Sequence, residues 1–336
     1  MIEEKLEIVI PTYNRGDFLD VTLNSLLNSP LKDCKITIRD NASLDNTPKI
    51  CEKYSRLFSN LHIIRNNTNI GGNANILRSY EYATYPYVWV LADNDKLNFD
   101  NCDEFIEAIE SEKYDLIICS SAWYVHYHNN DNPTFEDNGI YELIKEYKGD
   151  EINYLENKAQ DLALILKKDF FSITSFIPST IYRTSIFDDE TLIKAYDCIS
   201  ISYPHFAFIA KSLNDNLLTY KTKKDLVIIQ KNPDDWEIGK FGWYTRYISC
   251  ATLIEDKQIQ KYAVQIYDRL LYPVLAQLII SKANGEDNIK NDVFDLISTF
   301  LKLKGVFIGV LYSICLLLTY FLPKKICEIL VKIRFG

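Results

Sequence analysis

Short apolar runs alternate strictly with helical patterns along the first 120 residues. The apolar runs lie at 6–10, 35–39, 61–64, 87–91 and 115–119, and segments with helical spacing of apolar residues lie at 17–27, 47–58, 73–82 and 103–110. Parallel strands need a crossover between them, and a helix is the usual crossover. The pattern therefore predicts an α/β fold, in which a parallel, Rossmann-like sheet has helices on both faces.

Polar loops follow four of these expected strands. They are residues 12–15, 40–43, 69–73 and 93–95, one after each of the first four strands. In an open α/β sheet, the ligand crevice lies just outside the carboxyl ends of the strands. We therefore expect these four loops to converge on one binding site.

Three features of these loops suggest chemistry, and each has a simpler alternative. Asp93 and Asp95 lie on either side of Asn94, directly after an apolar strand. Two carboxylates this close together suit a hard divalent cation that also binds phosphates, although a solvated turn has the same pattern. Gly71 and Gly72 open a helix and can bring backbone N–H groups to a phosphate, or simply form a tight turn. Asp40 can accept a hydrogen bond from a base or ribose, or cap its own turn.

Several protein classes are disfavoured. The chain has no G-x-G-x-x-G after the first strand, no G-x-x-x-x-G-K-[ST] and no G-x-S-x-G, which disfavours a dinucleotide fold, a P-loop and an α/β-hydrolase. A net charge of −9 disfavours a general nucleic-acid binder. The eight cysteines form no C-x-x-C pair, and no signal-peptide pattern follows Met1, so we expect a cytoplasmic protein with reduced thiols.

The loop motifs resemble those of a known family. The runs IVIPTYNR, RDNAS, NIGGN and DND occur in the order and spacing of the family-two, inverting nucleotide-sugar glycosyltransferases of GT-A fold, over residues 5–125. The resemblance implies that Asp40 bonds the nucleobase and that Asp95, with Asp93 near the ribose, holds Mg²⁺ or Mn²⁺ on the diphosphate. The other residues expected to bind the nucleotide-sugar are Pro11, Thr12, Tyr13, Arg15, Gly72, Asn73, Arg78 and Asn94.

The middle of the chain resembles the acceptor side of one subgroup. Residues 175–183 and 203–206 are similar to bacterial O-antigen sugar transferases such as abequosyltransferases. Many family members carry a Glu-Asp pair as general base, and here Asp197 and His205 occupy that neighbourhood. We expect His205, in the first turn of a helix and facing the cleft, to be the base, with Asp197 as the substitute. The Q-x-x-R-W motif of processive members is missing, which favours addition of a single sugar.

The last 36 residues differ in charge from the rest. Residues 301–336 carry six basic residues and one acid, a net charge of +5, and 305–322 is uncharged. A helix of 18 residues is about 27 Å long, close to the thickness of a bilayer core. We expect this tail to bind an anionic membrane surface, with a membrane span or a buried, oligomer-forming helix as alternatives. Gly305 and Gly309 fit a helix-contact motif, a hint of a homo-oligomer.

These observations predict three regions and one activity. We expect a glycosyltransferase domain at 1–225 (nucleotide-sugar half 1–125, acceptor half 126–225), a mostly helical region at 226–300 and a membrane-associating tail at 301–336. The expected activity is metal-dependent, inverting transfer of one sugar from a nucleoside-diphosphate sugar to a lipid-linked glycan at the inner face of the cell membrane. A sugar-nucleotide pyrophosphorylase and a non-catalytic nucleotide- or glycan-binding protein are the alternatives.

Overall fold

A computed structural model describes residues 1–94, 96–99, 102–125, 142–145, 156–201, 203–231, 249–265, 271–285 and 289–335. Its first part alternates strands and helices as the sequence predicts. These elements are β1 (Leu6–Thr12), α1 (Gly16–Leu27), β2 (Lys35–Asp40), α2 (Thr47–Ser55), β3 (Leu61–Arg65), α3 (Gly72–Glu81), β4 (Tyr87–Val90), β5 (Lys96–Leu97), α4 (Cys102–Glu110) and β6 (Leu116–Val125).

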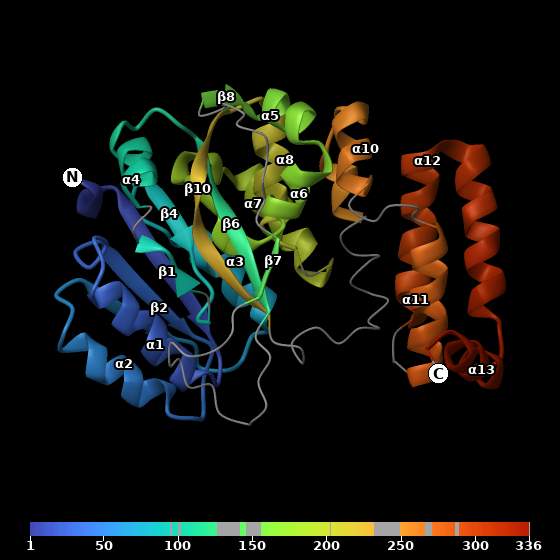
Figure 1. Cartoon of the computed structure of the whole chain (residues 1–336), viewed down its shortest axis with the longest axis horizontal. Coiled ribbons are helices and arrows are strands. Elements are labelled where there is room, and N and C mark those ends of the chain that lie inside the picture. The colour runs from blue at the N-terminus through green and yellow to red at the C-terminus, as the bar shows by residue number, and fades with distance from the viewer. Residues whose placement is uncertain are drawn as a thin grey trace.

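The second part adds further strands to the same sheet and then turns helical (Figure 1). Its elements are β7 (Glu142–Lys145), β8 (Glu156–Lys158), α5 (Ala159–Leu166), α6 (Lys168–Thr174), β9 (Thr180–Arg183), α7 (Asp189–Asp197), α8 (Phe206–Asn214), β10 (Leu218–Lys231), α10 (Lys257–Gln265), α11 (Leu271–Asn284), α12 (Ile289–Tyr320) and α13 (Lys324–Phe335).

The strands form one sheet in the order β3-β2-β1-β4-β9-β6-β10-β5, with β7 beside β6 and β8 beside β10. Strands β1 to β4 are parallel, as expected, but β9 lies antiparallel between β4 and β6. The five strands expected from the sequence are therefore parallel to one another, and the chain returns from its second half to insert one antiparallel strand between two of them. The glycosyltransferase domain was expected to end at residue 225. Strand β10 continues past that residue, so the sheet extends to Lys231.

Alternate residues of the central strands pack into two separate cores. Ile8 and Trp89 face the core covered by α1, α2 and α4, whereas Val9 and Val88 face the core covered by α3 and α5 to α8. Strands buried on both faces read as continuous apolar runs, which is the pattern in the sequence. The α/β fold with helices on both faces is confirmed.

Helices α11, α12 and α13 stand together at the end of the molecule away from β2 and β3 (Figure 1). Helix α12 folds back on itself, because the rings of Phe300 and Tyr312 have centroids 5.3 Å apart and stand edge to face. Twelve residues of straight helix would span about 18 Å. The close approach requires glycine, since a Cβ on Gly309 would lie 2.8 Å from the carbonyl oxygen of Phe300.

Candidate active site

The register of the sheet brings the first two polar loops together. Thr12 and Asp40 end neighbouring parallel strands as direct partners, and the N–H of Asn41 donates to the carbonyl of Thr12 at 2.9 Å. The loop after β4 joins them through Asp93, to which the Thr12 hydroxyl donates at 2.8 Å. The predicted convergence of these loops at one edge of the sheet is therefore observed.

Both carboxylate oxygens of Asp93 are engaged by neighbouring loops. The Arg15 guanidinium lies 3.0 Å from Oδ1, and Thr12 donates to Oδ2. The backbone of Asp93 is also held, because its carbonyl accepts from the Thr22 hydroxyl at 2.8 Å. A guanidinium beside the carboxylate repels a metal cation, so this arrangement suits Asp93 to positioning the loop rather than to direct ligation. Asp95, the other expected metal ligand, lies outside the described residues.

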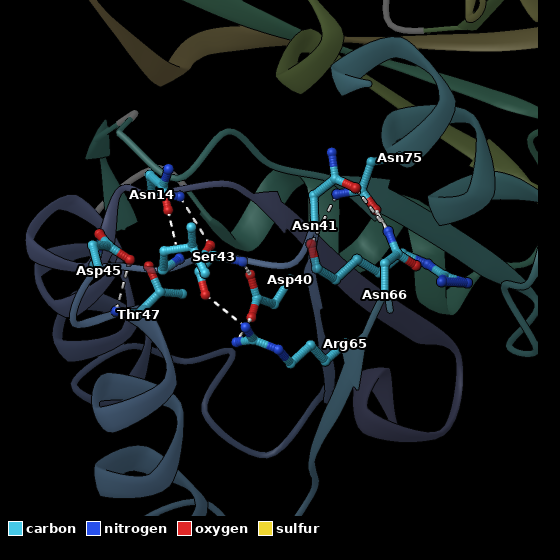
Figure 2. A network of polar contacts seen from close by, with 12 residues as sticks. Asn14, Asp40, Asn41, Ser43, Asp45, Thr47, Arg65, Asn66 and Asn75 are labelled. Atoms are coloured by element: carbon cyan, nitrogen blue, oxygen red, sulfur yellow. Dashed lines mark hydrogen bonds and ion pairs between the residues drawn. The ribbon is translucent and has the colours of Figure 1, made fainter. Parts of the chain in front are cut away.

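Asp40 is buried and bound within its own turn. Its Oδ1 accepts from the N–H of Ser43 at 2.9 Å, and its Oδ2 pairs with Nη1 of Arg65 at 2.6 Å. Arg65 also donates to the Ser43 carbonyl at 2.6 Å, which closes the ring of contacts drawn in Figure 2. The turn-capping alternative for Asp40 is therefore present in the structure, while its bond to a nucleobase stays a prediction.

Replacing Asp40 with alanine is expected to lower the free energy of unfolding by about 1.5–3 kcal/mol, because hydrogen bonds to a charged group are lost and a buried N–H is left unpaired. Asp40→Asn, which keeps one acceptor for Ser43, should cost less. Urea denaturation of the unliganded protein measures the effect. Asp103→Asn, at an exposed position of α4, is the control. A change below about 0.5 kcal/mol in Asp40→Ala would show that the turn does not depend on the carboxylate.

A ladder of asparagine side chains fixes the loop that precedes α3 (Figure 2). Asn41 donates to Asn69 at 2.8 Å and accepts from Asn66 at 2.9 Å. Asn66 also donates to Asn75 at 3.0 Å, and Asn75 donates to the Arg39 carbonyl at 2.8 Å. Neither Asn66 nor Asn75 was among the site residues expected from the sequence. The available signal was the repetition of asparagine after successive strands, since the Asn side chain both donates and accepts.

The glycine pair at the start of α3 leaves its backbone open to a ligand. Gly71 has φ of +89°, a conformation that favours glycine, and a Cβ on Gly71 or Gly72 would meet nothing within 4 Å. Asn73, next on the helix, donates to the carbonyl of Ile199 at 2.9 Å. The helix start is thus held against the second half of the chain. The N–H of Gly71 donates to Asn69 Oδ1 at 2.8 Å, while the space beside both glycines is open, a geometry suited to a phosphate at the following N–H groups.

Two arginines lie close together beside α3. Burial lowers the pKa of Arg39, and the positive charge of Arg78 lowers it further. Arg78 is half-buried in the last turn of α3, the end of the helix opposite the glycine loop. The two guanidinium groups together produce a positive field that favours an anionic ligand.

Three residues expected to bind the nucleotide-sugar lie at the end of β1 and directly after it. Pro11 is half-buried, Thr12 is buried and Tyr13 is exposed. Asn14 adopts a left-handed φ of 52° and is held at both ends, because its N–H donates to Ser43 Oγ at 2.9 Å and its Oδ1 accepts from the N–H of Leu44 at 2.7 Å. The loop that presents Tyr13 is therefore fixed before any ligand binds. Asn94, from the loop after β4, is half-buried.

His205 is enclosed by the protein, whereas its sequence position predicted a side chain facing the cleft. It is 1% exposed, and its Nε2 lies 3.1 Å from the Ser175 carbonyl, so Nε2 carries the hydrogen. Nδ1 has no hydrogen-bond partner within the part of the chain that the structure describes. Burial lowers the pKa of His205 to about 4, and its contacts with the backbone of Ser175 and Thr174 only partly oppose this. The ring is neutral near pH 7 but enclosed by the segment after α6.

Acidification is expected to destabilise the protein through His205. Its pKa is about 4 when folded against 6.5 for a free side chain, so the unfolded state binds more protons below pH 6.5 and stability falls as pH falls toward 4. The loss from this group is about 3 kcal/mol, at about 1.4 kcal/mol per pKa unit. Urea unfolding between pH 7 and pH 4 should therefore show a smaller pH dependence in His205→Gln than in wild type, with the exposed His62→Gln as control. Equal slopes in all three proteins would contradict the assignment.

Asp197 occupies a more accessible position. It is the last residue of α7 and is exposed, and it directly precedes the 3-10 helix η5 (Cys198–Ile201). Asn73 of α3 contacts this 3-10 helix at Ile199. Asp197 is therefore close in sequence to the point where the second half of the chain meets the glycine loop.

The carboxylates of this site would need oxygens from a bound ligand to hold a metal ion. Among the residues that the structure describes, no three His, Cys, Asp or Glu side chains gather in a way that could hold an ion. One or two carboxylates with substrate phosphates are a common way to bind Mg²⁺. Asp95 lies two residues after Asp93, whose carboxylate is paired with Arg15. Its position fits such a site, in which a diphosphate supplies further oxygens.

Comparison with known proteins identifies the first half of the chain. Residues 7–165 match the model of the family described as Glycosyl transferase family 2. The chain is 26% identical over 245 residues to abequosyltransferase RfbV of Salmonella typhimurium, covering 69% of this chain and 68% of the relative. It is 25% identical over 219 residues to the processive diacylglycerol beta-glycosyltransferase of Mycoplasma genitalium, covering 61% of this chain and 59% of that protein, less than two thirds of its length.

Solved structures show the same fold over nearly the whole chain. Residues 1–349 of TarS from S. aureus superpose with a TM-score of 0.59 at 15% identity, covering 98% of this chain and 92% of that one. TarS has also been solved in complex with UDP and with UDP-GlcNAc. The resemblance to family-2 glycosyltransferases of GT-A fold is confirmed.

Proposed function

We propose, on the premise that residues 7–165 form a family-2 glycosyltransferase domain, that this chain transfers one sugar from a nucleoside-diphosphate sugar to a hydroxyl of a glycan. The observation that carries the proposal is the convergence of four polar loops at the carboxyl edge of the sheet. Thr12, Asp93, Asp40 and the open glycine loop lie there within one network of contacts. The TarS complexes with UDP and UDP-GlcNAc support a nucleotide-sugar donor.

The proposed donor site divides the nucleotide among these loops. We assign the base to the loop of Pro11, Thr12 and Tyr13 with Asp40, and the diphosphate to the N–H groups at Gly72 and Asn73. We also assign to donor binding the positive charge of Arg78, on the same helix. Arg15 and Thr12 hold Asp93 in place, so the loop that continues into Asn94 and Asp95 starts from a fixed position.

We propose Asp95 as the carboxylate that holds Mg²⁺ or Mn²⁺. When bound, the ion stabilises the negative charge that develops on the departing diphosphate. The protein itself orients the donor and excludes other orientations of it. The asparagine ladder and the Asp40–Arg65 pair support this role, because they keep the loops rigid.

We propose a single displacement that inverts the anomeric carbon. The acceptor oxygen forms its bond to that carbon as the bond to the diphosphate oxygen breaks, and the acceptor proton passes to a base. Asp197 fits this role better than His205, because Asp197 is exposed whereas the His205 ring is enclosed. This reverses the order of preference that the sequence suggested.

The acceptor that we propose is a lipid-linked glycan at the inner face of the cell membrane, in cell-surface polysaccharide synthesis. The names of the relatives support this, since one transfers abequose and another glycosylates diacylglycerol, a membrane lipid. The second of these is processive, whereas the missing Q-x-x-R-W motif favours single-sugar addition here.

A panel of nucleotide-sugars tests the proposal. The full-length protein is incubated with UDP-, GDP-, dTDP- and CDP-linked sugars and Mn²⁺, and slow release of nucleoside diphosphate is measured. One donor class should be hydrolysed, and only with the metal present. Release of pyrophosphate when the protein is given a nucleoside triphosphate and a sugar 1-phosphate would instead support a pyrophosphorylase. Donor binding without any release would support a non-catalytic protein.

A further inference from the structure

The second half of α12 buries two hydroxyl side chains and exposes several large apolar ones. Ser313 and Thr319 are buried, and each hydroxyl bonds a carbonyl of its own helix, at 2.7 Å and 2.9 Å. On the outer side, Phe307 is 86% exposed and Leu318 is 68% exposed. A surface helix of a protein in water normally shows the opposite distribution.

Four of the exposed apolar residues of α12 lie on one stripe. Phe307, Leu311, Ile314 and Leu318 are spaced by four, three and four residues, which places them along one side of a helix, and the exposed Phe321 follows three residues later. Scattered apolar residues on a surface are ordinary, but a contiguous apolar stripe marks an interaction site.

Helix α13 continues the apolar surface. Ile326, Ile329, Leu330 and Ile333 are all exposed and follow the spacing of one helix face. Cys327, between them, is buried against the neighbouring helices. We call the residues of these two stripes, together with Phe321 between the helices, the apolar face; they are Phe307, Leu311, Ile314, Leu318, Phe321, Ile326, Ile329, Leu330 and Ile333.

Basic residues accompany this face. Lys324, Lys325 and Lys332 on α13 are exposed, and Glu328 is the single acid of that helix. The remaining 300 residues carry a net charge of −14, whereas residues 301–336 carry +5. Apolar residues together with lysines match an anionic lipid surface, which attracts the lysines and accommodates the apolar side chains.

The geometry of the two helices favours lying on a bilayer over crossing it. Among the described residues, no single helix is both long and apolar enough to span a bilayer. The segments Phe307–Tyr320 and Lys324–Ile333 reach that length and composition only as a pair, and they are bent by 99°. Two short helices at nearly a right angle present a broad surface rather than one continuous rod.

We propose that the apolar face and its lysines dock the protein on an anionic lipid bilayer, with α12 and α13 lying in the interface. The inference goes beyond sugar transfer, because lipid binding does not require the donor site. It also assigns a ligand to a surface on which a row of large apolar side chains is exposed. The membrane then holds the sheet-bearing part beside the lipid headgroups.

Flotation of the full-length protein with vesicles tests the proposal. We expect binding to phosphatidylcholine vesicles enriched in phosphatidylglycerol, weakening with salt, and much less binding to phosphatidylcholine alone. Lys324→Gln, Lys325→Gln and Lys332→Gln combined should lower the partition coefficient roughly 100-fold, from about 1 kcal/mol per basic residue and a factor of ten per about 1.4 kcal/mol. Lys32→Gln, Lys49→Gln and Lys158→Gln, all exposed and equal in charge, form the control.

A separate variant tests how much the apolar side chains contribute to lipid binding. Leu318→Asp should lower binding by at least about tenfold, because a leucine that enters the lipid is replaced by a negative charge at an anionic surface. Leu57→Asp, at an exposed site after α2, should bind as wild type does. Both variants should keep donor hydrolysis, so absence of that activity in wild type would count against the proposed function and not against docking.

Two results would overturn the docking proposal. One is a wild-type protein that stays unbound with anionic vesicles at low salt. If the wild-type protein also forms oligomers at high concentration, and the Leu318→Asp variant stays monomeric, a second copy of the chain covers the apolar face instead. The other is a lysine variant that floats as the control variant does.

Discussion

Replacing Asp95 with asparagine is expected to abolish metal-dependent sugar transfer, with a rate loss on the order of 10³-fold or more. The amide keeps the size of the side chain but removes the negative charge that a hard divalent cation requires. A metal supplies several kcal/mol to the departing group, and each step of about 1.4 kcal/mol is a factor of ten in rate. The measurement is donor hydrolysis and transfer against Mn²⁺ concentration.

Neighbouring variants separate a metal role from a folding role. Asp93→Asn removes the charge that pairs with Arg15 and is expected to lower the stability of the unliganded protein, because Arg15 loses its ion-pair partner. Asp95→Asn should unfold at the wild-type urea concentration. Asp103→Asn, on α4, should behave as wild type in both assays. An Asp95→Asn enzyme with undiminished Mn²⁺-dependent turnover would disprove the assignment.

The sequence predicted the strands well because their pattern is local. Successive residues such as Ile8, Val9 and Ile10 face two cores on opposite sides of the sheet, and both cores are apolar, so each strand is recognisable as a run. The position of β9 was not predictable in this way. Residues 180–183 pair with β4 and β6, which lie far earlier in the chain, and nothing in a local pattern specifies so distant a partner.

In the candidate site, too, the local pattern was predictable and the contacts between distant residues were not. The four loops were predictable because parallel strands end at one edge, so polar residues after each strand must approach one another. The ion pair of Asp40 with Arg65 was not, because Arg65 reaches the carboxylate from the end of the next strand and competes with any nucleobase for it. A pattern that assigns a residue to a ligand does not reveal which neighbours already occupy it.

His205 illustrates how burial can change an assignment. Its place in the first turn of a helix was predicted correctly, since α8 begins at Phe206 with His205 as its N-cap. The orientation was wrong because the segment Thr174–Ser175 packs over that turn and accepts its hydrogen bond. This contact joins residues 30 apart, and no spacing rule predicts it. The enclosed ring then leaves Asp197 as the accessible candidate.

Asp197→Asn is expected to lower the transfer rate by roughly 10²–10⁴-fold, the usual contribution of a general base. Donor affinity should be unchanged, because the base contacts the acceptor and not the nucleotide. The effect should therefore appear in kcat with acceptor present, while nucleotide binding, measured by calorimetry, stays at the wild-type value. Slow donor hydrolysis provides a second readout, since water as acceptor also loses its proton to the base.

The matched control for this variant lies on the same helix. Asp189→Asn is exposed at the opposite end of α7, carries the same change and should transfer at the wild-type rate. His205→Gln should lose stability and its pH dependence before it loses turnover, because the ring is enclosed rather than presented to an acceptor. If His205→Gln instead loses roughly 10²-fold or more in kcat at full stability, while Asp197→Asn transfers normally, the proton passes to the histidine. The segment over α8 must then open during the reaction, which the burial of the ring in the unliganded chain argues against.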